Sequence, residues 1–260
     1  MKYTTISSGT GELLENLILK YGQIVTVEQI FSEAGLAMNR QQTEYLIATL
    51  ARQGWLVRIK KGLYAITDLS TRGFLSLSPY VVANLLEKDS YVSFESALHH
   101  HGMFDQLTGK IISVSLKTHK TVRLQNVQYG FIKTKAGYYF GWQETQIDNK
   151  VAYVATAEKA IADMVHFHRS LYSVDIVIEK LREHKNNLDF GRFNEYLLKM
   201  SMTTMKIFGF IFDLMNIDSS KLLKRVKNVK GAHRMIASAK IFNAKWRLYY
   251  DIHFDKYKSP

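Results

Sequence analysis

The sequence predicts an α+β protein with more than one domain. Its 260 residues are enough for one large domain or two modest ones, each with its own core. Hydrophobic residues make up 47% of the chain and no low-complexity tract interrupts it, so we expect it to fold almost throughout. Apolar residues recur at helical spacing toward both ends, whereas short β-branched and aromatic runs fill the middle. This mixture predicts helices packed with a small sheet.

Three helical patterns follow one another at the start of the chain. The first covers residues 11–21, the second covers 27–34 with Thr26 as its cap, and the third covers 40–53 with Asn39 as its cap. A glycine follows each pattern, as is common after helix C-termini: Gly22, Gly35 and Gly54. The third helix has an apolar stripe that we expect to be buried, formed by Thr43, Leu46, Ile47 and Leu50.

Two short apolar runs come directly after the third helix, WLVRI at 55–59 and LYAI at 63–66. They are separated by two lysines and Gly62, and three residues ending in glycine suit a hairpin with that glycine in the left-handed conformation. Three helices and a hairpin within residues 1–68 are typical of a winged helix-turn-helix domain. The apolar flanks of the hairpin would pack on the helices, and its basic tip would contact phosphate.

A winged helix-turn-helix domain would read DNA with the solvent face of its third helix. Arginine and glutamine near the start of such a helix match the donors and acceptors that guanine and adenine present in the major groove. Basic residues of the hairpin would contact the phosphates and position the domain. The predicted DNA-binding residues are Arg40, Gln41, Gln42, Glu44, Tyr45, Arg52, Arg58, Lys60 and Lys61. Winged helices also dock on proteins, and the charge of this one is nearly balanced, with seven basic and six acidic residues.

The remainder of the chain predicts a linker at 69–79 and a second, α+β domain at 80–260. The linker is polar and ends at Pro79, the only internal proline. In the second domain, Ser93 is expected to cap a helix at 94–101. The other elements that we expect are strands at 111–117, 127–134, 138–142, 151–156 and 246–254, and helices at 80–88, 157–168, 172–184, 189–200 and 204–215.

Charge and composition limit the possible functions. The formal net charge is +12, and residues 219–260 hold eleven basic residues against two acidic ones, which suggests either a polyanionic partner or a solvated basic surface. Without cysteine the chain has no disulfide, no thiolate zinc site and no cysteine nucleophile. No apolar run reaches membrane-spanning length and the N-terminus lacks a signal-peptide core, so we expect a cytoplasmic protein with no membrane partner.

No motif in the sequence predicts catalysis, a metal site or a cofactor. His99, His100 and His101 would point about 100° apart on a helix, so they cannot bind one metal ion together. We expect them to stabilise the C-terminal end of this helix, because a protonated histidine there interacts favourably with the helix dipole. Glu158 and Asp163 are five residues apart and would diverge, with Glu158 stabilising the start of its helix. The chain has no phosphate-binding loop, nucleophile elbow, HExxH motif or dinucleotide fingerprint.

Three segments together resemble the AbiEi antitoxin family, the transcriptional regulators of type IV toxin-antitoxin systems. The matching positions are Arg58, Lys61, Gly62 and Tyr64, then Tyr91, Ser93, Ser96, Ala97, Leu98, His101 and Gly102, and finally Glu158, Lys159, Ala160 and Asp163. The resemblance implies a winged helix that represses its own operon by binding promoter repeats, and a second, antitoxin domain. It also implies a nucleotidyltransferase-like toxin as the functional partner, without a stable complex. Family members often have proline where this chain has Ala157.

The sequence therefore predicts an antitoxin that binds double-stranded promoter DNA and represses its own operon, and that is not an enzyme. The first alternative is a module that interacts with a protein or an RNA and has no operator-specific DNA binding. The second is a nucleic-acid-processing enzyme whose acidic residues come together only in three dimensions.

Overall fold

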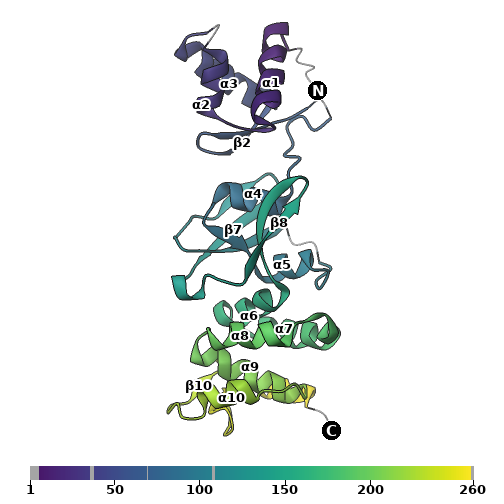
Figure 1. The fold of residues 1–260 in the computed structure, drawn as a ribbon, viewed down its shortest axis with the longest axis vertical. Coiled ribbons are helices and arrows are strands. Elements are labelled where there is room, and N and C mark those ends of the chain that lie inside the picture. The colour runs from purple at the N-terminus through teal and green to yellow at the C-terminus, as the bar shows by residue number, and fades with distance from the viewer. Residues whose placement is uncertain (1–5, 36–37, 69, 107–108, 259–260) are drawn as a thin grey trace.

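The computed structural model describes residues 6–35, 38–68, 70–106 and 109–258. These residues form an elongated stack of three tiers, and the chain runs from the upper tier to the lower one (Figure 1). The upper tier holds α1 to α3 with a small sheet, the middle tier holds the largest sheet, and the lower tier is mainly helical. The prediction of a mixed α and β architecture is confirmed.

The upper tier, which we call the N-terminal module, runs from Ser8 to Ile66. Its strands form an antiparallel sheet in the order β1-β3-β2. Both predicted caps are present, because the side chains of Thr26 and Asn39 accept hydrogen bonds from backbone amides of the helices that they precede. The elements are α1 (Ser8–Tyr21), β1 (Ile24–Thr26), α2 (Val27–Ala34), α3 (Arg40–Gln53), β2 (Leu56–Lys60) and β3 (Leu63–Ile66).

The sheet of the N-terminal module is covered on both faces. One face carries Leu56 and Ile66, which join a core with residues of α1, α2 and α3. The other face carries Ile59 and Ala65, which join a second core with residues of the middle tier such as Leu86. Strand side chains alternate between the two faces, so the hairpin ties the module to the rest of the molecule.

The middle tier is built on a six-stranded sheet in the order β6-β7-β5-β4-β9-β8. The pairs β5 with β7 and β4 with β9 are parallel, and the other pairs are antiparallel. The elements are α4 (Pro79–Leu86), β4 (Ser90–Val92), α5 (Phe94–His100), β5 (Lys110–Ser115), β6 (Val122–Leu124), β7 (Val127–Lys133), the 3-10 helix η1 (Ala136–Tyr138), β8 (Trp142–Ile147) and β9 (Lys150–Ala155).

The lower tier packs five helices with a three-stranded sheet of order β10-β12-β11. The four helices that the sequence predicts between 157 and 215 are confirmed, with ends that differ by no more than two residues. The elements are α6 (Ala157–Phe167), α7 (Leu171–Glu183), η2 (Lys185–Asn187), α8 (Phe190–Leu198), α9 (Met202–Leu214), α10 (Ser220–Val226), β10 (His233–Arg234), β11 (Ile241–Asn243), β12 (Leu248–Tyr250) and η3 (Ile252–Tyr257).

Two predicted strands are wrong. The expected strand 138–142 is instead the end of η1 and a loop, because Gly141 has φ +76° and turns the chain, so that β8 begins at Trp142. The expected strand 246–254 is extended only over β12. Arg247 turns with φ +48°, and the Asp251 side chain accepts a hydrogen bond from the His253 amide and caps η3.

The segment after β3 lies against the N-terminal module. The Gly73 amide donates a hydrogen bond to the Gly54 carbonyl (2.9 Å), and the Arg72 guanidinium donates to the Gln53 carbonyl (2.9 Å) while lying over the Trp55 ring. Gly54 has φ +81°, and a Cβ there would come within 3.0 Å of the Gly73 backbone. Glycine is therefore required at position 54 for two reasons, the helix end and this close approach. The domain boundaries at residues 68 and 80 stay a prediction.

Candidate nucleic-acid interface

Most of α3 is exposed to solvent. Only Thr43, Ile47 and Leu50 of its 14 residues are buried, and they share one face. The opposite face carries Gln41, Tyr45, Ala48 and Arg52, all of them exposed, with the Tyr45 side chain 70% accessible. The helix thus presents a broad polar surface at the upper end of the molecule.

Several of the predicted DNA-binding side chains already have partners within the module. Arg40 and Glu44 form an ion pair (Nε to Oε1, 3.2 Å), and the Arg40 guanidinium lies 5.8 Å from the centre of the Phe31 ring on α2. Arg52 donates a hydrogen bond to the Thr49 hydroxyl (3.2 Å). Both arginines are exposed, so these contacts are weak and a DNA partner can compete for them.

Gln42 has a second role as part of the helix cap. Its side-chain oxygen accepts a hydrogen bond from the Asn39 backbone amide (2.9 Å), and its own amide donates to the Asn39 side chain (2.9 Å). The side-chain oxygen of Gln42 thus already accepts one hydrogen bond, whereas its NH2 group has no partner among the described residues. Within the described part of the chain, no side-chain hydrogen bond or ion pair engages Gln41, Tyr45, Arg58 or Lys61.

The structure separates the two lysines of the hairpin. Lys61 is exposed in the turn beside Gly62, which has φ +79° as the sequence predicts for this position. The Lys60 ammonium instead donates a hydrogen bond to the Leu86 carbonyl (2.9 Å) at the end of α4. Lys60 thus lies at the junction with the middle tier and Lys61 lies in solvent. Their contact with phosphate stays a prediction.

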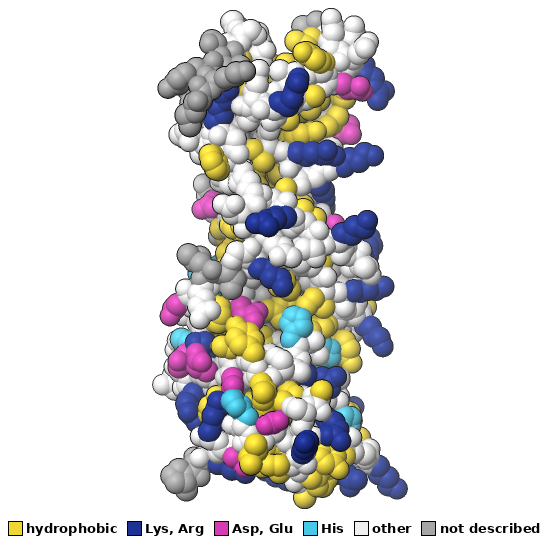
Figure 2. Space-filling model, turned by 180° about the vertical axis from the view of Figure 1, so that it is seen from behind, with side chains coloured by type: hydrophobic (Ala, Val, Ile, Leu, Met, Phe, Trp, Pro, Cys, Tyr) yellow, Lys and Arg dark blue, Asp and Glu magenta, His cyan; other side chains and the backbone are white. Residues whose placement is uncertain are grey.

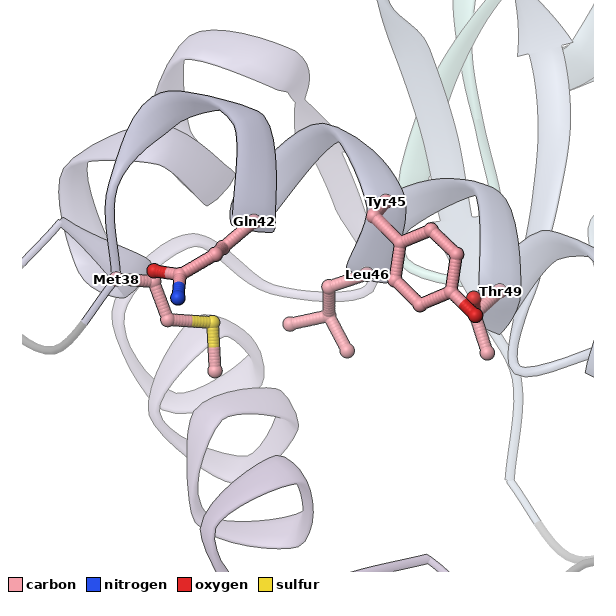
Figure 3. A pocket seen from close by; sticks show the side chains of 5 residues that line it. All are labelled: Met38, Gln42, Tyr45, Leu46 and Thr49. Atoms are coloured by element: carbon pink, nitrogen blue, oxygen red, sulfur yellow. The ribbon is translucent and has the colours of Figure 1, made fainter.

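A shallow groove of about 410 Å³ runs along one flank of α3. Figure 3 shows the side chains of Tyr45, Leu46 and Thr49 extending from α3 toward this space. The side chain of Met38, the residue just before the Asn39 cap, extends toward it as well. Gln42 also lines the groove. The helical periodicity predicts Leu46 in the core stripe and gives no role to Met38 or Thr49. The signal available in the sequence was their spacing, because residues 38, 42, 45 or 46 and 49 follow one another at intervals of three or four and so lie on one side of a helix.

Four residues of the middle and lower tiers that carry the family resemblance form a buried network. Asp163 on α6 accepts hydrogen bonds from the Ser93 hydroxyl (2.8 Å) and the Tyr91 hydroxyl (3.1 Å). Lys159, one helical turn earlier, pairs with Asp163 and donates to the Tyr91 hydroxyl (2.8 Å). The side chains of Lys159 and Asp163 are fully inaccessible. Ser93 stands at the N-cap position of α5 as predicted, but its hydroxyl contacts Asp163 on α6 and makes no cap hydrogen bond to α5.

Burial governs the titration of this network. It lowers the pKa of Lys159 and raises the pKa of Asp163, because each charged form loses its hydration, and the attraction between the two groups opposes both shifts. Burial, reinforced by the Asp163 charge, also raises the pKa of Tyr91. Gly141 covers Lys159 so closely that a Cβ there would lie 2.9 Å from its side chain. With no opening to solvent at Lys159 or Asp163, the network ties β4 and α5 to α6.

Glu158 and Asp163 have separate partners, as their spacing predicts. Arg192 on α8 donates two hydrogen bonds to the Glu158 carboxylate (2.8 and 3.2 Å), and the Asp189 amide donates a third (2.9 Å). Burial raises the pKa of Glu158, but these donors outweigh it and the pKa lies below its ordinary value. From the sequence, Glu158 is expected only to stabilise a helix start. The i, i+4 spacing of Lys159 and Asp163, both on the same helix, was the signal that could have revealed their ion pair.

The three consecutive histidines turn toward different partners. The His99 ring shares a hydrogen bond with the Tyr80 hydroxyl (3.0 Å), the His101 ring contacts the Ala155 carbonyl (2.8 Å), and His100 packs edge-on against the Tyr80 ring. Among the residues that the structure describes, no three histidine or acidic side chains are grouped to hold a metal ion.

The basic C-terminal segment is only partly neutralised. Lys245, Lys256 and Lys258 pair with Asp213, Asp175 and Asp255. The basic residues on and just after α10 are all exposed: Lys221, Lys224, Arg225, Lys227 and Lys230. Figure 2 shows lysine and arginine side chains along one edge of the molecule, from the upper tier to the lower. In the described parts of the chain, no helix has the length and apolar character needed to cross a bilayer.

Comparison with known proteins matches the N-terminal module to a family of transcriptional regulators of the antitoxin class. Residues 12–67 match the family model described as a transcriptional regulator, AbiEi antitoxin. The match covers the N-terminal module and agrees with the resemblance to the AbiEi antitoxin family that the sequence shows. That family is one of regulators, not one known for an enzymatic activity.

The whole fold also has a solved counterpart. The crystal structure of the RV2827C protein from Mycobacterium tuberculosis is similar over 95% of this chain and 92% of that chain, with a TM-score of 0.66 and 15% sequence identity. At this identity the likeness concerns the fold alone. Among curated proteins, no match to the sequence was found.

Proposed function

We propose that residues 1–68 form a winged helix-turn-helix domain that binds double-stranded promoter DNA, and that the protein is an antitoxin that represses its own toxin-antitoxin operon. The observation that carries the proposal is the match of residues 12–67 to a family of transcriptional regulators, in a module whose α3 exposes a polar face with few internal contacts. The element order α1, α2, α3 and hairpin is the order that this type of domain requires.

In this proposal α3 enters the major groove. Gln41, Tyr45 and Arg52 lie at the centre of its exposed face and would approach the base edges, with Arg40, Gln42 and Glu44 on the flanks. Arg58 and Lys61 are exposed and would contact the backbone. Lys60 belongs to the predicted set, but its ammonium donates a hydrogen bond to the Leu86 carbonyl. This contact would hold the hairpin against the middle tier.

The main test is fluorescence anisotropy of the full chain with the duplex found upstream of its own gene and with a scrambled duplex, at about 50–300 mM salt. We expect submicromolar, sequence-selective binding that weakens steeply with salt. Equal, weak binding to both duplexes would contradict the role as a promoter regulator.

The hairpin contribution is tested with single substitutions. Lys61→Ala is expected to weaken binding to every duplex and to reduce the salt slope by about one unit, because one phosphate contact and its released counterion are lost. Lys185→Ala is the matched control, since Lys185 is an exposed lysine in the lower tier. A salt slope that Lys61→Ala leaves unchanged would remove the hairpin turn from the DNA interface.

Base reading is tested separately with Gln41→Ala. Because the side chain of Gln41 is exposed and free within the described chain, both its donor and its acceptor are available for a bidentate contact with adenine. The substitution is expected to cost about 1–3 kcal/mol at one operator position and to relax the preference there. An equal loss on all sequences would contradict base reading by Gln41.

The toxin relation is part of the same proposal. By family resemblance the functional partner is a nucleotidyltransferase-like toxin that forms no stable complex with the antitoxin. The alternative is a protein- or RNA-interaction module without operator-specific binding, and the nearly balanced charge of the N-terminal domain is the observation that favours it. Copurification from the native host separates the two, because a stoichiometric protein or RNA partner together with no DNA selectivity would support the alternative.

A further inference from the structure

The groove on α3 has a chemical character that differs from the rest of the exposed helix. Met38 and Leu46 give it a partly buried apolar floor, and the 70% exposed Tyr45 ring forms one wall. The Gln42 side chain lies at the same flank. An apolar strip beside a polar donor is thus placed next to the side chains that are proposed to approach bases.

We propose that this groove receives the C5-methyl group of thymine, with Met38, Tyr45 and Leu46 around the methyl and Gln42 donating a hydrogen bond to the thymine O4 atom. The inference rests on the proposed DNA-binding function and deepens it by assigning a base to one flank of α3. Thymine is the base that displays a methyl group in the major groove, next to the O4 acceptor.

The hydrogen bonding of Gln42 restricts what it can read. Its side-chain oxygen already accepts the Asn39 amide (2.9 Å) and is held toward the helix cap, so the NH2 donors are the groups of this glutamine left fully available to DNA. A bidentate contact with adenine needs both a donor and an acceptor from the side chain. Cytosine presents its N4 amino group, which is a donor, whereas the NH2 group of Gln42 needs an acceptor on the base. Guanine, adenine through its N7 atom, and thymine can each accept from the Gln42 NH2 group, but only thymine adds an apolar group that fits the floor formed by Met38 and Leu46.

The position of the groove agrees with this occupant. Its lining extends from Met38, just before the helix cap, to Thr49, and the N-terminal part of a recognition helix is the part that reaches base edges. At 1.5 Å per residue this length is about 16 Å, which spans several base-pair steps of about 3.4 Å. The volume of about 410 Å³ exceeds a single methyl group, so thymines at adjacent steps are expected to share it.

The test compares thymine with deoxyuridine, which pairs identically but lacks the methyl group. The duplex upstream of the gene and a scrambled duplex are each prepared with thymine and with deoxyuridine at every thymine position. We expect the full chain to bind the upstream duplex about fourfold more weakly for each methyl that the groove buries. The two forms of the scrambled duplex are expected to bind alike.

Two variants link the methyl effect to the groove. Met38→Ala removes part of the apolar floor outside the helix and is expected to shrink the thymine-to-deoxyuridine ratio toward one. Leu19→Ala is the control, because Leu19 is an 84% exposed leucine on α1 and does not line the groove. The control is expected to keep the full ratio. Circular dichroism verifies that both variants are folded.

The outcomes separate this inference from the proposed function. Selective binding of the upstream duplex with no difference between thymine and deoxyuridine would overturn the thymine contact and leave the promoter role standing. The absence of selective binding would overturn the proposed function and the inference with it. A methyl effect that Met38→Ala leaves unchanged would place the contact elsewhere. If Met38→Ala instead alters the oligomeric state in light scattering, with no methyl effect, the groove is a protein contact and the inference is wrong.

Discussion

The helices α3 and α6 use their polar residues in opposite ways. In α3 only three of 14 residues are buried, and arginine, glutamine and tyrosine side chains face solvent. In α6 nine of 11 residues are buried, including Glu158, Lys159 and Asp163, and each of these has a partner inside the protein. These polar side chains of α6 are hydrogen-bonded within the protein, whereas several of those on α3 remain available for a partner.

A polar residue in a motif can therefore either stabilise the fold or bind a ligand. Tyr91, Ser93, Lys159 and Asp163 carry much of the family resemblance, yet they lie in a closed network that holds α6 against β4 and α5. Gln41 and Lys61 are exposed, have no side-chain hydrogen bond or ion pair among the described residues, and lie where a ligand can reach them. Substitutions in α6 should therefore act on folding, and substitutions in α3 should act on binding.

The largest expected effect is that of Asp163→Asn. It removes the counter-charge of Lys159 in a site without solvent access, and breaking such a pair costs about 3–5 kcal/mol. Urea unfolding of the full chain measures the loss. The paired substitution Lys159→Met with Asp163→Leu is expected to recover part of it, because no charge is then left buried. A loss below about 1 kcal/mol for Asp163→Asn would contradict a structural role for the pair.

Acid should weaken the lower tier at the end of α6. Burial, with the nearby charges of Lys159 and Arg169, lowers the pKa of His166 to about 4 from its ordinary value of 6.5, and its ring shares a hydrogen bond with the Thr204 hydroxyl (2.9 Å). The folded state thus favours neutral His166. Its contribution to stability is complete above about pH 6.5 and is lost as the pH falls toward about 4.

Thermal unfolding from pH 4 to 8 tests this titration. His166→Asn keeps a hydrogen-bonding side chain without the titration, so its stability should fall less than that of the unsubstituted chain between pH 6.5 and 4. Parallel curves for the two proteins would show that another group causes the acid sensitivity.

The smallest expected effect on stability is that of Asn39→Ala at the start of α3. It removes the side-chain acceptor of the Gln42 amide, and loss of such a cap costs about 1 kcal/mol. Because Asn39 is exposed, no cavity or buried charge adds to this cost. Hydrogen exchange should show faster opening of α3 with unchanged protection of α6. Equal acceleration in both helices would contradict the contrast between them.

Local chemistry explains which elements could be predicted. Thr26 and Asn39 before apolar helical patterns, with Gly54 after one, predict the helix ends because a cap or a left-handed glycine acts within a few residues. The turn at Gly62 follows from the same kind of local preference. The strand expected at 246–254 failed because alternation records only which side chains are buried. Trp246, Leu248 and Phe254 are buried, but in a turn, a strand and a 3-10 helix, and Ile252 of the same alternating set is 69% exposed.

The sequence by itself determined the order and type of most elements, the family of the N-terminal module and the polar character of α3, because periodicity, caps and motif spacing are encoded locally. Only the tertiary structure decided that Lys60 turns to Leu86 while Lys61 stays in solvent, since this depends on the packing of the hairpin against α4. It also brought Ser93 to Asp163, 70 residues away, and left a groove beside Gln42. Contacts of this kind depend on the relative placement of whole elements, which no local pattern specifies.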